Sequence, residues 1–149
     1  MAVAQKTEYA LRALFELAKR NGIDPVPVSV IAEAQAIPPR FLENVLIQVK
    51  AAGIVESVRG RDGGYRLARP PEEITMGHVL RAMEGSIAPV NCIGGRGQEN
   101  CPMRGRCVFL PMWKRAHDAM LDVYDGTSYA DLLEQEKAQS REHVPAFQI

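Results

Sequence analysis

Several features that are missing from this 149-residue sequence exclude whole classes of protein. No apolar run approaches the ~18 to 20 residues that a membrane span needs. The first twenty residues place Glu8, Arg12 and Glu16 inside their apolar pattern, unlike a secretory signal. No nucleophile–base pair, phosphate-binding loop or HExxH motif is found, and the three histidines form no motif. We therefore expect a cytoplasmic protein that neither binds a membrane nor acts as an enzyme on a small-molecule substrate.

Cysteine is scarce, and its distribution is uneven. All three cysteines lie in one stretch, "NCIGGRGQENCPMRGRC", residues 91–107, and an odd number cannot all pair within one chain. Cytoplasmic thiols stay reduced, so clustered cysteines indicate metal or redox chemistry rather than disulfides.

The formal net charge is zero, since 18 basic residues balance 18 acidic ones. The first 70 residues nevertheless carry more Lys and Arg than Asp and Glu, which permits nucleic-acid binding by that half without establishing it. A hydrophobic content of 46% is enough for the core of one domain.

Hydrophobic periodicity in the first half predicts three helices. An amphipathic helix covers 7–20, a short helix with Ser29 as its cap follows over 30–35, and a third begins at the pair Pro38-Pro39 and ends before Gly53. The core-facing residues expected on the third helix are Phe41, Leu42, Val45, Leu46 and Val49. Two helices joined by a short turn form a helix-turn-helix pattern.

The opposite face of the third helix carries Arg40, Glu43, Asn44 and Ile47 at helical spacing. An arginine, a carboxylate and an amide are suited to reading guanine, cytosine and adenine edges in the DNA major groove. The alternative is an ordinary solvated helix face.

A β-hairpin is expected directly after this pattern. Its strands cover 54–58 and 65–67, and "RGRDGG", residues 59–64, supplies the glycines of a turn and the cations Arg59 and Arg61. Such a hairpin is the wing of a winged-helix domain, and an arginine at its base suits a narrow minor groove. The alternative is a hairpin whose arginines only aid solubility.

The predicted fold class is mainly α with a small β wing. We expect a winged helix-turn-helix domain over 1–70, a connecting helix within 71–91 that Thr75 caps, a cysteine loop over 92–107, a long dimerisation helix and short last helix within 108–135, and a flexible tail over 136–149. The long helix carries Trp113, His117, Met120 and Tyr124 near one stripe, which predicts a homodimer because helix-turn-helix proteins usually read two half-sites as symmetric pairs. Packing of that stripe within the chain is the alternative.

Cys92, Cys101 and Cys107 have the spacing C-x8-C-x5-C, which lacks the C-x2-4-C knuckle of structural zinc sites. Thiolates are soft ligands that select iron–sulphur clusters, zinc or copper(I), and a cluster accepts widely spaced ligands. The nearby glycines, Gly94, Gly95, Gly97 and Gly105, let the backbone wrap around it, and the arginines Arg96, Arg104 and Arg106 can offset its negative charge. From the residues alone, a cluster, another metal and a thiol redox switch all remain open.

Four segments carry a resemblance to a known family: "EYALRALFELA", "IPPRFLENVL", "VRGRDGGYRLARP" and the three-cysteine loop before "MWKRAHDAML". Over roughly residues 5–135 the sequence resembles the IscR/NsrR-type (Rrf-two) family of bacterial winged-helix regulators. The resemblance implies a transcription factor that binds a [2Fe-2S] or [4Fe-4S] cluster through the three cysteines and senses iron, iron–sulphur status, redox state or nitric oxide. It also matches Arg40, Glu43, Asn44 and Arg59 to the family's DNA-reading surface.

The sequence departs from that family in two places. Leu110 stands where the iron–sulphur-assembly branch has a histidine, and the interval after Cys92 is longer than the common one. The fourth ligand must then come from elsewhere, and Glu8 of the partner subunit occupies the place of an acidic ligand in nitric-oxide- and redox-sensing members. His78 and His117 are alternative ligands. Three thiolates and one oxygen ligand favour [4Fe-4S] over [2Fe-2S].

The resulting hypothesis is a homodimeric regulator whose binding to a double-stranded DNA operator is controlled by an iron–sulphur cluster. Lys6, Lys50 and Arg61 are expected to contact phosphates. The alternative is a cluster-free thiol-redox regulator that uses Cys101 and Cys107 as its switch pair. A small iron–sulphur electron carrier would leave the reading helix and the arginine wing without a purpose.

Overall fold

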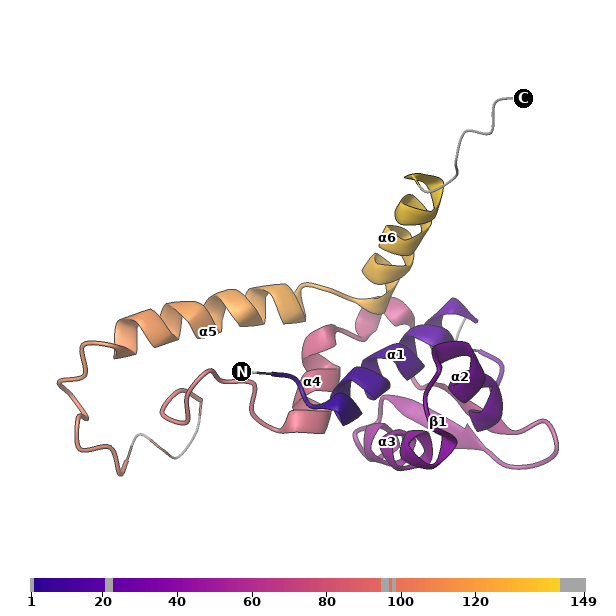
Figure 1. Ribbon diagram of the computed structural model, residues 1–149, viewed down its shortest axis with the longest axis horizontal. Helices are drawn as coiled ribbons and strands as arrows, with labels where there is room; N and C mark the ends of the chain where they lie inside the picture. Colours follow the sequence, from indigo (N-terminus) through magenta and orange to yellow (C-terminus); the bar gives the residue numbers. More distant parts are fainter. Residues whose placement is uncertain (1, 21–22, 95–96, 98, 143–149) are drawn as a thin grey trace.

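The computed structural model of the chain describes residues 2–20, 23–94, 97 and 99–142. Its elements in chain order are α1 (Gln5–Lys19), α2 (Val28–Gln35), α3 (Pro39–Ala51), β1 (Val55–Val58), β2 (Gly64–Leu67), a 3-10 turn η1 (Pro71–Glu73), α4 (Met76–Glu84), α5 (Leu110–Asp125) and α6 (Tyr129–Glu142). The predicted fold class, mainly helical with a small β wing, is confirmed (Figure 1). Among the described residues, no helix is both long and apolar enough to cross a membrane.

One hydrophobic core joins the two halves of the sequence. Leu14 and Leu17 of α1 pack in it with residues from α2, α3 and the wing, all nearly or fully inaccessible to solvent. Val79 of α4 and Tyr129 of α6 belong to the same core, and the Tyr129 hydroxyl donates a hydrogen bond to the Leu11 carbonyl oxygen at 3.1 Å. Helices α4 and α6 therefore complete the core of the preceding elements.

The helix-turn-helix is formed by α2 and α3, as predicted, but two details differ. Pro27, not Ser29, is the N-cap of α2, since Ser29 already lies within the helix. Phe41 was expected in the core and is 59% exposed. The buried residues of α3 are Leu42, Val45, Leu46 and Val49. This i, i+3, i+4, i+7 stripe already fills the face that meets α1, which leaves Phe41 at its edge.

The wing is an antiparallel pair in which Val55 lies opposite Leu67 and Val58 opposite Gly64. Gly60 in the turn has φ +115°, a conformation that favours glycine. At Gly64 an added Cβ would lie 2.1 Å from the Val26 carbonyl oxygen, so the absence of a side chain permits the bridge between Val26 and Tyr65 that ties the wing to the segment before α2. The predicted hairpin is confirmed.

Two details of the second half can be compared with the prediction. Thr75 caps α4, as expected, by accepting a hydrogen bond from the His78 backbone N–H at 3.3 Å. The last helix, α6, continues to Glu142 and so includes the first part of the predicted tail. Residues 143–149 of that tail lie outside the described residues.

Helix α5 extends away from the body formed by the other helices (Figure 1). None of its residues is fully buried in the single chain. Its C-terminal end is fixed to α4, because Arg81 makes a two-pronged ion pair with Asp125 at 2.6 and 2.8 Å. The chain between α4 and α5, which carries the cysteines, contains neither an α-helix nor a strand in its described residues.

Candidate nucleic-acid interface and thiol segment

The outer face of α3 presents the residues predicted to read DNA. Arg40, Glu43 and Asn44 are all exposed, and Ile47 is 58% exposed. They lie on the side of α3 opposite to its buried stripe. These three polar side chains offer a guanidinium, a carboxylate and an amide, next to an apolar group that can contact a thymine methyl.

A shallow groove of about 290 Å³ lies beside this face, between α3 and the start of α1. Its lining residues on α3 include Phe41 and Gln48, and those on α1 include Lys6 and Tyr9. Sequence reasoning assigned Phe41 to the core and did not consider Gln48. The helical spacing of Gln48 from Asn44, i and i+4, was the signal that could have placed Gln48 on the reading side.

The wing carries further exposed cations. Arg59 and Arg61 are exposed at the hairpin turn, as expected for groove or phosphate contacts. Figure 1 shows α3 and the hairpin along the lower side of the molecule. Lys50 is also exposed, but its Nζ donates a hydrogen bond to the Ser57 hydroxyl at 2.6 Å. Lys50 therefore braces α3 against β1 in this structure.

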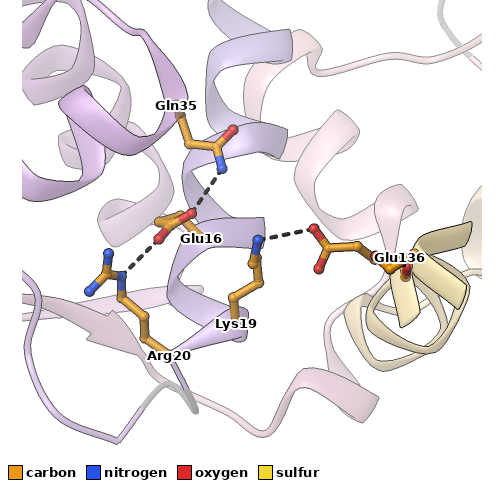
Figure 2. Close-up of polar contacts among 6 residues, drawn as sticks. Glu16, Lys19, Arg20, Gln35 and Glu136 are labelled. Carbon is orange, nitrogen blue, oxygen red and sulfur yellow. Dashed lines mark hydrogen bonds and ion pairs between the residues drawn. The ribbon is translucent and has the colours of Figure 1, made fainter. Parts of the chain in front are cut away.

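A buried carboxylate on α1 links this helix to the helix-turn-helix formed by α2 and α3. Glu16 is 6% exposed and accepts hydrogen bonds from Gln35 Nε2 at 2.9 Å and from Arg20 Nε at 2.8 Å (Figure 2). Burial raises the pKa of Glu16, but the hydrogen bonds from Gln35 and Arg20 outweigh burial and hold the pKa below its ordinary value. Because Gln35 is the last residue of α2, this bond fixes the end of α2 that leads into α3.

The three cysteines lie between α4 and α5, in residues 85–109, which we call the thiol segment. They are free thiols, each partly buried. Two glycines in their segment, Gly94 and Gly105, adopt positive φ values of 72° and 80°. Positive φ values favour glycine at these two positions, and the wrapping of the backbone around a cluster stays a prediction. Gly95 and Arg96 lie outside the described residues.

The donor set fits a thiolate-bound cluster in its chemistry, because three unpaired cysteines lie within sixteen residues of irregular chain. The structure does not bring these thiols together, since the described residues contain no group of three or more metal-ligating side chains. Gathering them around a metal would require the segment between α4 and α5 to rearrange.

Glu8 is exposed in the first turn of α1 and joins no metal-ligating group within the described chain. The turn that carries it is fixed by Glu84, which accepts hydrogen bonds from the Thr7 hydroxyl and from the Ala4 N–H. Hydrogen bonding by Thr7 and Ala4 lowers the pKa of Glu84. Glu84 is the last residue of α4, so it links the turn of Glu8 to the start of the thiol segment.

The two histidines considered as ligands have different surroundings. The His78 Nδ1 accepts a hydrogen bond from the Thr75 N–H at 3.2 Å, so His78 serves as part of the cap of α4. His117 is half-buried on α5, and its Cε1 would lie 3.9 Å from a Cβ added at Gly94. Of these two histidines, only His117 is shown near the cysteines. It lies close to Gly94, which is two residues after Cys92 in the sequence.

The stripe predicted for dimerisation is half-buried in the single chain. Trp113, His117, Met120 and Tyr124 are half-buried, and Met120 and Tyr124 line a cavity of about 140 Å³ with residues of α4 and the N-terminal segment. Packing within the chain accounts for Met120 and Tyr124, and the role of the helix in dimerisation stays a prediction. A different face of α5 is exposed.

Comparison with known proteins gives consistent matches over nearly the whole chain. The family model "Rrf2: Iron-dependent Transcriptional regulator" matches residues 3–135. The HTH-type transcriptional regulator IscR of Aliivibrio salmonicida is 32% identical over 149 residues, covering 98% of this chain and 87% of the relative.

Two solved structures have similar folds. CymR, the global cysteine regulator of B. subtilis, has a TM-score of 0.75 at 32% identity, with 91% of this chain and 98% of that chain covered. IscR of T. potens has a TM-score of 0.74 at 32% identity, with 93% and 91% covered. The chain is thus equally similar to an IscR and to a cysteine regulator.

Proposed function

The chain belongs to the Rrf2 family of transcriptional regulators, and we propose that an iron–sulphur cluster held by Cys92, Cys101 and Cys107 controls its binding to a DNA operator. Proteins of this family are regulators, and the chain is not an enzyme. One observation carries the proposal: every thiol is free and partly exposed in the single segment that joins α4 to α5. A regulator that acts on chromosomal DNA in a bacterium works in the cytoplasm.

DNA recognition is assigned to α3 and the wing. Arg40, Glu43 and Asn44 contact base edges in the major groove, and Arg59 enters the adjacent minor groove. Arg61 contacts phosphates, a role in which Lys50 takes part only after its bond to Ser57 is exchanged for one to the backbone of DNA. The exposure of these side chains supports this assignment.

The thiol segment is placed so that a change in it reaches both halves of the molecule. It begins after Glu84, which holds the first turn of α1, and it ends at Leu110, where α5 starts. A bound cluster would supply an iron centre that responds to oxidants, nitric oxide or iron supply. The three cysteines hold it, and we propose [4Fe-4S] rather than [2Fe-2S].

We assign the fourth ligand to Glu8 of a second copy, in a homodimer. Its carboxylate is exposed and has no ion-pair partner among the described residues. Movement of the α1 turn that carries it would shift Glu84 and the α2–α3 unit that packs on α1. A coupling of about 1–3 kcal/mol between the two sites would change operator affinity about 5- to 150-fold.

The test is anaerobic purification followed by iron and acid-labile sulphide analysis. We expect about four iron and four sulphide ions per chain, against about two of each for [2Fe-2S]. Cys92→Ser, Cys101→Ser and Cys107→Ser should each lose the iron, while Glu43→Ala should retain it and lose operator specificity. Iron-free wild-type protein from oxygen-free cells would contradict the cluster.

A second candidate function follows from the separated thiols and from the similarity to a cysteine regulator. In it, Cys101 and Cys107 form a reversible disulfide on oxidation, and no metal is bound. This candidate predicts colourless anaerobic protein whose operator affinity changes with peroxide and recovers with dithiothreitol. Cys101→Ser would abolish that response, whereas Cys92→Ser would leave it intact.

A further inference from the structure

Ile47 is an apolar side chain in the middle of the face of α3 that we assign to DNA reading. It follows Arg40, Glu43 and Asn44 at helical spacing, and it is 58% exposed. A single exposed isoleucine is ordinary on a protein surface, but the other members of this row can all form hydrogen bonds to base edges. Ile47 can form none, so its part in reading DNA must be a contact with an apolar group.

The second large apolar side chain exposed on α3 has a different position. Phe41 is 59% exposed, but it lines the groove of about 290 Å³ that α3 forms with the start of α1. The described residues that line this groove do not include Ile47. Of the two side chains, Ile47 is therefore the one whose exposed surface is free to meet a base in the major groove.

We propose that Ile47 contacts the C5-methyl group of a thymine in the operator and so selects a T·A base pair at that position. The inference rests on the DNA recognition in the proposed function and adds one specified base to it. The thymine methyl is the apolar group that an unmodified base pair presents in the major groove. Its contact with Ile47 removes apolar surface of both groups from water, which favours binding to this base.

The geometry of α3 places this thymine near the bases read by its polar neighbours. Ile47 lies about 4.5 Å along the helix axis from Asn44 and about 6 Å from Glu43, which corresponds to one or two base pairs of DNA. A cytosine at the same place would present its amino group to a side chain that cannot accept a hydrogen bond. An unpaired donor in a closed interface is unfavourable, so Ile47 also disfavours cytosine.

The experiment first selects binding sites from a randomised DNA duplex library with the full-length wild type and with Ile47→Ala. We expect both to enrich the same sites except at one base pair, where only the wild type prefers T·A. Deoxyuridine in place of that thymine removes only the methyl group, and it should raise the Kd of the wild type about three- to fivefold. Ile47→Ala should bind the thymine and deoxyuridine duplexes equally well, so the two changes are not additive.

Ile23→Ala is the matched control, because Ile23 is 70% exposed and lines a hollow with Leu133 of α6, outside the reading helix. It should distinguish the two duplexes as the wild type does. An unchanged base preference in Ile47→Ala, or an equal loss on the deoxyuridine duplex for Ile47→Ala and the wild type, would overturn the thymine contact alone. A wild type that enriches no sequence would overturn the DNA recognition itself, and the iron analysis tests the cluster separately.

Discussion

Replacing Glu16 with alanine should destabilise the protein and loosen the attachment of the helix-turn-helix, α2 and α3, to α1. The side chain is nearly inaccessible and accepts bonds from Gln35 and Arg20 (Figure 2). A hydrogen bond to a buried charged group contributes about 1.5–3 kcal/mol. The Arg20 side chain is 45% exposed, so its share is only about 0.5 kcal/mol. Glu16→Ala should therefore cost about 2–3 kcal/mol, or roughly a 5–10 °C fall in Tm.

The assay is urea unfolding of Glu16→Ala, Gln35→Ala and the double variant, which forms a double-mutant cycle. The coupling energy should be about 1–2 kcal/mol, because each single change removes the same bond. Glu136→Ala is a suitable control, since it removes the Lys19–Glu136 pair shown in the same figure. Both side chains of that pair are 40% exposed, so the loss should stay below about 0.5 kcal/mol.

The same variants connect stability with function. Operator affinity of folded Glu16→Ala should fall, because the end of α2 loses its link to α1, whereas Glu136→Ala should bind normally. Additive effects of the Glu16 and Gln35 changes, or equal losses for Glu16→Ala and Glu136→Ala, would refute the assignment of Glu16 as the residue that holds α2.

Three further predictions follow from the structure. Ala36 ends α2 with φ +50°, so Ala36→Gly should raise the free energy of unfolding, measured by urea titration, by up to about 1 kcal/mol. A Cβ at Gly77 would lie 1.8 Å from the Asp125 Oδ1, so Gly77→Ala should break the Arg81–Asp125 pair and lower Tm. Gly53→Ala meets open space, so it should lower Tm only through the strain of its positive φ of 73° and leave the Arg81–Asp125 pair intact. Hydrogen bonds to the Glu84 carboxylate lower its pKa, so the stability they contribute is present above about pH 4.5 and is lost as pH falls through the lower folded value. Glu84→Gln should reduce the slope of unfolding free energy against pH in that range.

Much of the fold could be predicted because local signals and tertiary packing agree. The buried stripe of α3, the glycines of the wing and the cap at Thr75 are all decided within a few residues of chain. The reading face followed from the stripe, because side chains opposite a buried face are exposed.

Other features depend on which surfaces meet, and periodicity alone could not decide them. Phe41 is apolar but lies beyond the area that α1 covers. On α5 two apolar stripes adjoin, and only the position of α4 shows that Met120 and Tyr124 pack within the chain while Met112 is exposed. The hydrogen bond between Glu16 and Gln35 joins residues 19 positions apart, so no local sequence pattern predicts it.

The central claim is that the thiol segment controls the DNA-reading surface through bound iron. Its most direct test is the operator Kd of one anaerobic preparation, measured before and after the iron is removed by a chelator, with Cys107→Ser as reference. We expect the Kd to change at least fivefold on iron removal and to match that of Cys107→Ser afterwards. Identical operator binding in all three samples would contradict the account.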